Sequence, residues 1–276
     1  MPLLTIKDLQ SQNEDELAPF LQRAQSITDK YEEFIEQDGG DSHTRHPGIH
    51  ASEISGCQRK VVYSLMATKR VEKSAPVWKK RFKVGHAIHK MLQDDFEKMA
   101  RRSNFAITFE PEANVAPGLD QVKAAEWQIY SHCDGIFTIR DGWNGPAVAR
   151  VLLEIKTASP GEYEKLKEPK PEHIEQAHVY MACLDVPMIW FLYYNKGNQN
   201  YTPANNPSFF VRFNQKKWEE LEGRFEAAHT HVHLKTLPDR QESVGCEFCA
   251  FSWTCQPKYL VRRPGGHATH TRWSKP

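Results

Sequence analysis

The segment VLLEIKTAS, residues 151–159, restricts the fold of this chain more than any other. Its apolar run continues a pattern that begins at residue 147 and predicts a β-strand over 147–158. Because successive side chains of a strand point to opposite faces, Glu154 and Lys156 share one face while Ile155 points the other way. An acid and a base are costly to bury beside apolar side chains unless they have a partner or a role. The strand therefore carries either an ordinary ion pair or part of a catalytic site.

Apolar spacing predicts further helices and strands on both sides of this strand. Helices are expected over residues 13–37, 52–68, 76–100, 170–184 and 215–234, the last with Asn214 as its N-cap. Strands are expected over residues 107–115, 127–140, 188–195 and 208–213. The turn-forming residues DGWNG at 141–145 predict a hairpin between strands 127–140 and 147–158. We therefore expect one α/β domain with helical flanks.

The composition is that of a globular protein, with 39% hydrophobic and 26% charged residues. No run of about 18 apolar residues is present, so we expect no membrane span. The chain begins with an acidic segment and lacks a basic region followed by an apolar one, so we expect no secretory signal. These features predict a cytoplasmic protein with no membrane partner.

The net charge of +1 does not by itself indicate a nucleic-acid partner, but the distribution of charge is uneven. One stretch, residues 59–83, is strongly basic and holds a single acid, Glu72. Its basic residues are Arg59, Lys60, Lys69, Arg70, Lys73, Lys79, Lys80, Arg81 and Lys83. Such a stretch can follow the phosphates of a nucleic acid, or it can be a solvated helix face.

A second carboxylate precedes the strand of Glu154 by about 20 residues. Asp134 lies in YSHCDGIFTI, on the strand that the predicted hairpin pairs with Glu154 and Lys156. Two carboxylates and a lysine at the edge of a sheet form a hard oxygen site for Mg²⁺ or Mn²⁺. The alternative is that Asp134 is a turn residue, since Asp-Gly is common in turns.

Three further polar positions lie on predicted helices. His89 and His86 occur in VGHAIHKMLQDDF, where a histidine on an apolar helix face is more often a core residue than a ligand. Gln176 and Tyr180 are four residues apart, so they share one helix face.

Taken together, these residues resemble the RecB-like branch of the PD-(D/E)xK nucleases. The pattern of that family is G-x-x-x-H, an Asp before an apolar strand, E-x-K and then Q-x-x-x-Y. It is filled here by Gly85 to His89, Asp134, Glu154 to Lys156, and Gln176 to Tyr180. The G-x-x-x-H match selects His89 over His86. The resemblance implies a restriction-endonuclease-like core, with a central mixed sheet flanked by helices.

The resemblance also implies roles for these residues. His89, Asp134 and Glu154 would bind the metal ion, helped by the carbonyl group of Ile155. Lys156 would orient or deprotonate the attacking water and stabilise charge on the phosphate. Gln176 and Tyr180 would position Lys156 or the DNA backbone. Because an imidazole ligand suits Mn²⁺ better than Mg²⁺, we expect Mn²⁺ to support activity well.

Six cysteines are present, and four of them form a second pattern. Cys246, Cys249 and Cys255 give C-x2-C-x5-C near the C-terminus, and Cys57 is the natural fourth ligand of a metal site. The other two, Cys133 and Cys183, lie in apolar runs and are expected to be buried small side chains. Spacing alone does not distinguish zinc from an iron–sulfur cluster.

The arrangement of one Cys before the nuclease motifs and C-x2-C-x5-C after them resembles the iron–sulfur nucleases. These include the AddB nuclease domain and the four-cysteine nucleases of CRISPR adaptation, whose cysteines hold a 4Fe–4S cluster. The surroundings of the first Cys also match, as S-x-x-x-x-C-x-R-x-x-x-Y, at Ser52, Cys57, Arg59 and Tyr63. The resemblance implies a structural cluster that closes a loop of nearly 200 residues, worth roughly 4–5 kcal/mol on the disulfide model.

The expected organisation is an N-terminal helical extension over 1–50, a nuclease domain over 51–260 and a flexible tail over 261–276. The resemblance implies an exonuclease that acts on single-stranded DNA or DNA ends, in a bacterium or a phage-infected host. The basic stretch of residues 59–83 with Trp78 and Phe82 could hold a strand by charge and stacking; the alternative is that these aromatic residues belong to the core. No G-x-x-x-x-G-K-[ST] motif is present, so a helicase, a recombinase or CRISPR adaptation proteins are candidate partners. Two alternatives are a DNA-binding adaptor with little cleavage activity and a zinc-stapled protein whose E-x-K is only an ion pair.

Overall fold

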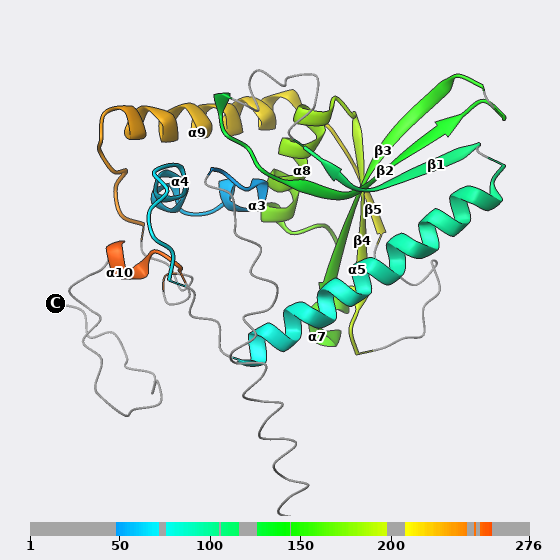
Figure 1. Ribbon diagram of the computed structural model, residues 1–276, viewed down its shortest axis with the longest axis horizontal. Helices are drawn as coiled ribbons and strands as arrows, with labels where there is room; N and C mark the ends of the chain where they lie inside the picture. The colour runs from blue at the N-terminus through cyan, green and yellow to red at the C-terminus, as the bar shows by residue number, and fades with distance from the viewer. Residues whose placement is uncertain are drawn as a thin grey trace, which may run out of the picture.

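The computed structural model describes residues 48–71, 76–104, 106–115, 126–143, 145–197, 208–241, 246 and 249–255. Five strands form the centre of the fold (Figure 1). They are β1 (Ile107–Asn114), β2 (His132–Arg140), β3 (Ala147–Ala158), β4 (Met188–Asn195) and β5 (Ser208–Arg212). The helices are α3 (Ala51–Ile54), α4 (Gln58–Leu65), α5 (Pro76–Arg102), α7 (Pro160–Tyr163), α8 (Pro171–Leu184), α9 (Gln215–His233) and α10 (Ser252–Cys255).

The five strands form a single sheet in the order β1-β2-β3-β4-β5. The β1–β2, β2–β3 and β4–β5 pairs are antiparallel, while β3 and β4 are parallel. The predicted hairpin of residues 127–140 and 147–158 is therefore confirmed. The parallel pair requires a crossover, which α7 and α8 supply. The predicted fold class, α/β with a central mixed sheet flanked by helices, is confirmed by this arrangement.

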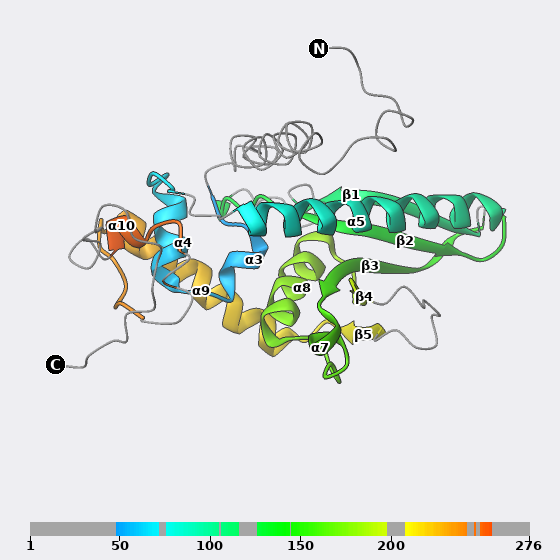
Figure 2. The same cartoon turned by 90° about the horizontal axis from the view of Figure 1, so that it is seen from below.

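Helices cover both faces of the sheet, as Figure 2 shows, and each face has its own apolar core. Leu92 of α5 packs against Phe137, Leu153 and Ile155 on one face. The other face packs against α8 and α9, where buried residues such as Phe225 lie in a larger core. Since alternate β3 residues enter the two cores, the apolar run of β3 is explained by its burial on both faces.

Most predicted elements agree with the structure to within one or two residues, but two predictions were wrong. The helix expected over 52–68 is divided into α3 and α4, because the chain adopts an extended conformation at Cys57 (φ −64°, ψ 123°). The strand expected over 127–140 begins only at His132, since residues 127 and 128 form a turn with a positive φ of 53° at Gln128. The short helices α7 and α10 were not predicted.

Other predictions concern particular residues. Asn214 caps α9 as predicted, because its side chain accepts a hydrogen bond from the backbone N–H of Lys217 at 3.0 Å. Cys133 and Cys183 are buried, as expected for small apolar side chains. The expected helix over 13–37 and the expected tail over 261–276 lie outside the described residues. Among the described helices, none has the length and apolarity needed to cross a membrane.

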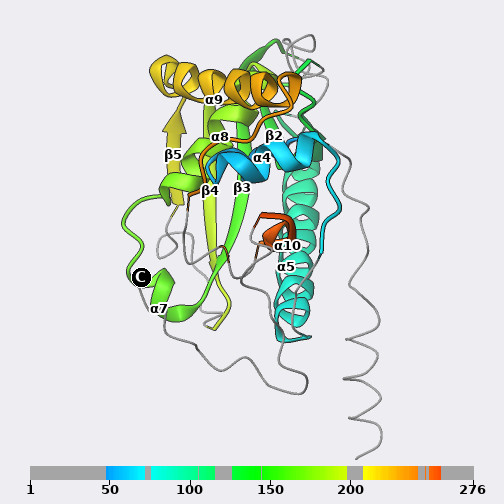
Figure 3. The same cartoon turned by 90° about the vertical axis from the view of Figure 1, so that its left-hand side faces the viewer.

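The two ends of the described chain meet beside α4, as Figures 1 and 3 show for α4 and α10. The backbone N–H of Val71 donates to the carbonyl of Ala250 at 2.9 Å. The rings of Tyr63 and Phe251 are 5.4 Å apart, and the guanidinium of Arg70 lies 5.1 Å from the centre of the Phe251 ring. The cysteine-containing C-terminal segment is thus packed against the segment that contains Cys57.

Candidate active site

The candidate site lies at a fork in the sheet, where β2 and β3 separate. Their pairing ends at Gly135 and Leu153, and beyond that point β3 continues beside β4. The same register would place Asp134 opposite Glu154. Asp134 instead directs its carboxylate across the fork, where Oδ2 accepts a hydrogen bond from the backbone N–H of Ile155 at 2.6 Å. A backbone donor freed by the fork is thereby satisfied by a charged side chain.

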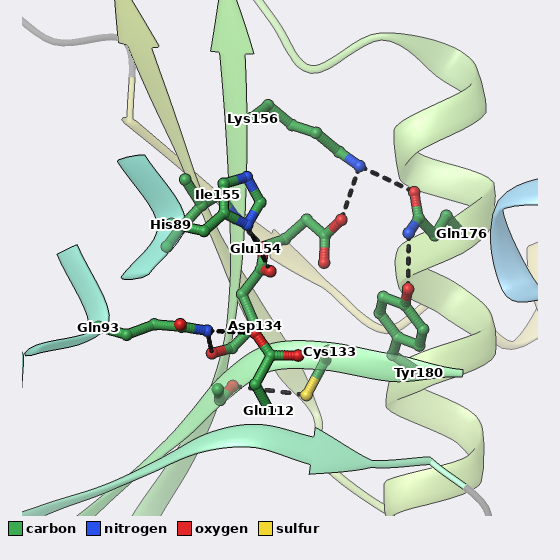
Figure 4. A network of polar contacts seen from close by, with 11 residues as sticks. His89, Gln93, Glu112, Cys133, Asp134, Glu154, Ile155, Lys156, Gln176 and Tyr180 are labelled. Carbon is green, nitrogen blue, oxygen red and sulfur yellow. Dashed lines mark hydrogen bonds and ion pairs between the residues drawn. The ribbon is translucent and has the colours of Figure 1, made fainter. Parts of the chain in front are cut away.

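Glu154, Lys156, Gln176 and Tyr180 form one chain of polar contacts on the α8 face of the sheet (Figure 4). Lys156 Nζ lies 2.6 Å from Glu154 Oε1 and donates to Gln176 Oε1 at 2.9 Å. The amide of Gln176 then donates to the Tyr180 hydroxyl at 2.6 Å. Strand alternation and the four-residue helical spacing thus bring together the residues for which the sequence predicts one site.

His89 joins the site from α5, on the side opposite α8. Its Nδ1 lies 2.9 Å from Asp134 Oδ1, whereas His86 is exposed. The preference for His89 over His86 therefore agrees with the geometry. Ile155 is buried, and its N–H contacts Asp134; the role predicted for its carbonyl group stays a prediction.

Two residues of this network, Gln93 and Glu112, were missed by the sequence analysis. The amide of Gln93, one helical turn after His89, donates to Glu112 Oε1 at 2.7 Å and to the Asp134 carbonyl at 2.9 Å. The β1–β2 register sets Glu112 opposite Asp134, and Glu112 has a positive φ of 48°, which is strained for a residue with a side chain. Glu112, Asp134 and Glu154 thus come from three successive strands at the point where the β2–β3 pairing has ended. Neither motif matching nor periodicity signals this grouping.

Burial and charge perturb the titrating groups of the site. Burial raises the pKa of Glu154, and the charge of Lys156 offsets part of this rise. Burial alone would lower the pKa of His89, but the hydrogen bond and the charge of Asp134 outweigh burial, so this pKa is raised. Burial also raises the pKa of Tyr180, which keeps its hydroxyl protonated. Such perturbed groups around one point are typical of catalytic sites.

The donor set of the fork suits a hard divalent cation. Across the described parts of the chain, no three His, Cys, Asp or Glu side chains are arranged so that they could hold a metal ion. His89, Asp134 and Glu154 are instead paired with one another and with Lys156. The chemistry of the set nevertheless fits, because a buried carboxylate of raised pKa is stabilised by a cation, and two carboxylates with an imidazole suit Mn²⁺ or Mg²⁺. Binding would require these side chains to exchange their present partners.

The four cysteines assigned to the second pattern lie in one region although nearly 200 residues separate the first from the last. Burial raises the pKa of Cys249, and the charge of Lys60 opposes part of this rise. Charges on Cys246 and Cys57 also raise this pKa, so both thiols lie near Cys249. Cys255 accepts a hydrogen bond from Arg59 at 3.7 Å. Four thiols beside two cations suit a cluster whose thiolate ligands carry negative charge. The residue types fit the predicted ligand set. No three of these described thiols are arranged so that they could hold a metal ion, so binding would require them to move together, and the cluster stays a prediction.

The basic stretch of residues 59–83 is largely engaged in internal contacts. Arg59 donates to the carbonyl of Pro238 at 2.6 Å. Lys60 and Arg70 pair with the buried carboxylate of Glu53 at 3.4 and 3.2 Å. Its exposed side chains include Lys69, before α5, and Phe82, on α5, which is 62% exposed. Phe82 is thus accessible for stacking, while the side chain of Trp78 lies outside the described residues.

No protein-family model and no curated protein sequence matches this chain. Among solved structures, SSO0001 is similar with a TM-score of 0.48 and 15% identity, and the match covers 84% of this chain and 97% of that one. LHK-Exo in complex with dAMP matches with a TM-score of 0.45 and 15% identity, covering 70% of this chain and 91% of its own. A second structure of LHK-Exo, an alkaline exonuclease from Laribacter hongkongensis, matches over the same shares at 15% identity with a TM-score of 0.39. At this level of similarity, function is inferred from the site and not from the fold.

Proposed function

We propose that this protein is a metal-dependent DNA nuclease that hydrolyses phosphodiester bonds at the sheet fork. One observation carries the proposal: Lys156 Nζ lies between the carboxylate of Glu154 and the amide of Gln176. The adjacent N–H of Ile155 is bonded to Asp134, which in turn contacts His89. The E-x-K pair thus lies within a larger network that reaches α5 and α8. An isolated surface ion pair would need none of these partners.

The side chains of the fork can divide the work of phosphodiester hydrolysis. His89, Asp134 and Glu154 would hold the divalent cation, which supplies Lewis acidity and an acidified water when bound. Lys156, held by Gln176, would orient that water and face the charge that develops on the phosphate. Tyr180 holds Gln176 through its hydroxyl and so fixes the lysine. The proposed substrate is single-stranded DNA or a DNA end, with exonuclease action.

We further propose that Cys57, Cys246, Cys249 and Cys255 bind a 4Fe–4S cluster that holds the two ends of the domain together. The packing of the C-terminal segment on α4 supports this role, because the four thiols come from exactly those two segments. Zinc is the alternative occupant. Protein purified without oxygen should show a broad absorption near 400 nm that dithionite bleaches, and a colourless protein containing zinc would overturn the cluster proposal.

The nuclease proposal is tested by cleavage of end-labelled single- and double-stranded DNA with Mn²⁺ or Mg²⁺. The wild type should cut with either metal, and Glu154→Gln should abolish cleavage while leaving the fold intact, since Gln keeps the shape of Glu. Lys98→Gln is a matched control because Lys98 forms only an exposed pair with Asp95. A wild type that binds DNA and cuts nothing would replace the nuclease by a DNA-binding adaptor.

A further inference from the structure

A surface cavity adjoins the candidate active site at the carboxyl end of β3. Its volume is about 430 Å³, and its lining comes from the segment between β3 and α8. The lining residues are Ser159, Gly161, Glu162, Lys165, Leu166 and Lys170. Ser159 follows Lys156 by three residues, a distance of about 10 Å along a strand. A strand of DNA whose scissile phosphate lies at Lys156 therefore has this cavity within reach.

A hydrogen-bonded relay connects this cavity to the sheet. The backbone N–H of Lys170 donates to the hydroxyl of Tyr193 at 3.3 Å, and the same hydroxyl lies 2.7 Å from Nδ1 of His173. Tyr193 pairs with Lys156 in the β3–β4 register, and His173 precedes Gln176 by one helical turn. The relay and the catalytic lysine thus occupy the same level of the sheet and face the same helix.

Both rings of the relay are uncharged near neutral pH. The Tyr193 oxygen accepts the N–H of Lys170, and its contact with Nδ1 of His173 has the phenol as donor or as acceptor according to the tautomer of the imidazole. Burial lowers the pKa of His173 to about 3, helped by the charges of Lys156 and Lys170, so the ring stays neutral. Burial raises the pKa of Tyr193 to about 12, so the phenol keeps its proton. The relay thus connects the backbone of Lys170, a residue of the cavity lining, to the sheet without adding charge.

The charges around the cavity favour an anion. Lys165 and Lys170 face one acid, Glu162, which hydrogen-bonds with Ser159 at 2.8 Å and lies 3.4 Å from Lys170. Both partners of the Glu162–Lys170 pair are substantially exposed, so the pair is weak and Lys170 can turn to another anion. A lining with two lysines and one acid is suited to a phosphate diester.

We propose that this cavity is a subsite for a backbone phosphate of the DNA strand next to the scissile phosphate. Lys165 and Lys170 supply positive charge, and the relay of Tyr193 and His173 holds the backbone of Lys170 in position. The subsite rests on the nuclease function proposed above, and it extends the binding surface from the fork toward α7.

Binding without metal tests the subsite independently of catalysis. The probe is fluorescein-labelled (dT)12 in EDTA, measured by fluorescence anisotropy at several salt concentrations. Lys165→Gln and Lys170→Gln should each weaken binding and reduce the salt slope by about 0.7, the value for one lost phosphate contact on a single strand. Lys167→Gln is the matched control, because Lys167 is exposed in the same loop and does not line the cavity. Glu162→Gln should act in the opposite sense and tighten binding.

His173 is tested as a positioning residue. His173→Leu removes a partner of the Tyr193 hydroxyl, which holds the backbone of Lys170, and should weaken binding of (dT)12 in EDTA. His173→Gln keeps a polar group for this hydroxyl and should restore most of the binding. Equal loss in both variants, or no loss in His173→Leu, would refute this role.

The outcomes separate the subsite from the nuclease function. If Glu154-dependent cleavage is present and the Lys165, Lys170 and Lys167 variants bind alike, the subsite is wrong while the nuclease stands. If no cleavage occurs and binding still depends on Lys165 and Lys170, the subsite stands as a DNA contact and the nuclease falls. Thymidine monophosphate and inorganic phosphate serve as competitors. If either displaces (dT)12 when present at the same concentration as (dT)12, the cavity is a site for free phosphate and the strand subsite is wrong.

Discussion

Replacing Lys156 with Met would leave Glu154 as a buried carboxylate without its ion pair. The Glu154 side chain is 5% exposed, and its Oε1 lies 2.6 Å from Lys156 Nζ. Removing one partner of a buried pair typically costs about 3–5 kcal/mol, because the remaining charge stays uncompensated. Met retains most of the apolar stem of the lysine, so the loss is electrostatic. We expect Lys156→Met to lower the free energy of unfolding by about 3–5 kcal/mol at pH 8.

This loss should depend on pH in a definite direction. Burial already raises the pKa of Glu154, and Lys156 lowers it, so removal of the lysine raises this pKa further. A carboxyl group whose pKa is higher in the folded than in the unfolded protein binds an extra proton in the folded state. Stability therefore falls as the pH rises from the unfolded pKa to the folded one. The penalty of Lys156→Met should be small near pH 5 and should increase as the pH rises toward and above 8.

The assay is urea unfolding followed by tryptophan fluorescence, at pH 5 and pH 8, with EDTA to exclude divalent cations. Lys156→Met combined with Glu154→Gln should regain most of the stability lost at pH 8, since the buried charge is gone. Lys98→Met breaks an exposed pair, in which Lys98 and Asp95 are 62% and 64% exposed, and should change stability by less than about 0.5 kcal/mol. Equal losses at both pH values, or no recovery in the double variant, would refute the reasoning.

Three other changes test separate parts of the structure. Cys249→Ala should remove the absorption near 400 nm and destabilise the protein by up to roughly 4–5 kcal/mol, the value for closing the loop. A colourless variant of full stability and activity would contradict the cluster. Gln93→Leu removes the amide that donates to both Glu112 and Asp134, and it should weaken Mn²⁺ binding about 10- to 100-fold in a metal titration. Unchanged affinity would show that this donor is dispensable. Asn214→Ala should lower the thermal midpoint by about 2–4 °C through the loss of one helix cap, and no shift would mean that the cap is redundant.

The parts of the site that follow from local periodicity could be predicted from the sequence. Strand alternation places Glu154 and Lys156 on one face, and helical spacing aligns Gln176 with Tyr180. Both relations depend only on the backbone geometry of a single element. The contact between the two elements, Lys156 Nζ to Gln176 Oε1, was predicted from the family resemblance and not from spacing.

The parts that depend on pairing between strands could not be predicted. The end of the β2–β3 pairing at Gly135 and Leu153 creates the fork, and no residue pattern within either strand specifies where pairing stops. The positive φ of Glu112 likewise depends on the surrounding fold. The contacts of Arg59 with Pro238 and of Arg70 with Glu53 could not be predicted either. A run of basic residues in a sequence looks like a DNA-binding stretch until the partners of its side chains are known.

The fork gives Asp134 two roles that can be separated by mutation. Its Oδ2 accepts the N–H of Ile155, and Ile155 is 1% exposed, so an unmatched N–H there would cost about 1–3 kcal/mol. Asp134→Asn keeps an oxygen that can accept this hydrogen bond but loses the negative charge. Asp134→Ala loses both.

We therefore expect Asp134→Asn to unfold in urea close to the wild type while cleavage is lost, and Asp134→Ala to be destabilised and inactive. An Asp134→Asn variant that still cleaves DNA with Mn²⁺ would show that Asp134 serves only the fork. The predicted metal ligand would then be a structural residue, and the cation would have to be held by the side chains that remain at the fork, Glu154 and His89. Because the stability and the cleavage of one variant are measured separately, the two roles are resolved whichever result is obtained.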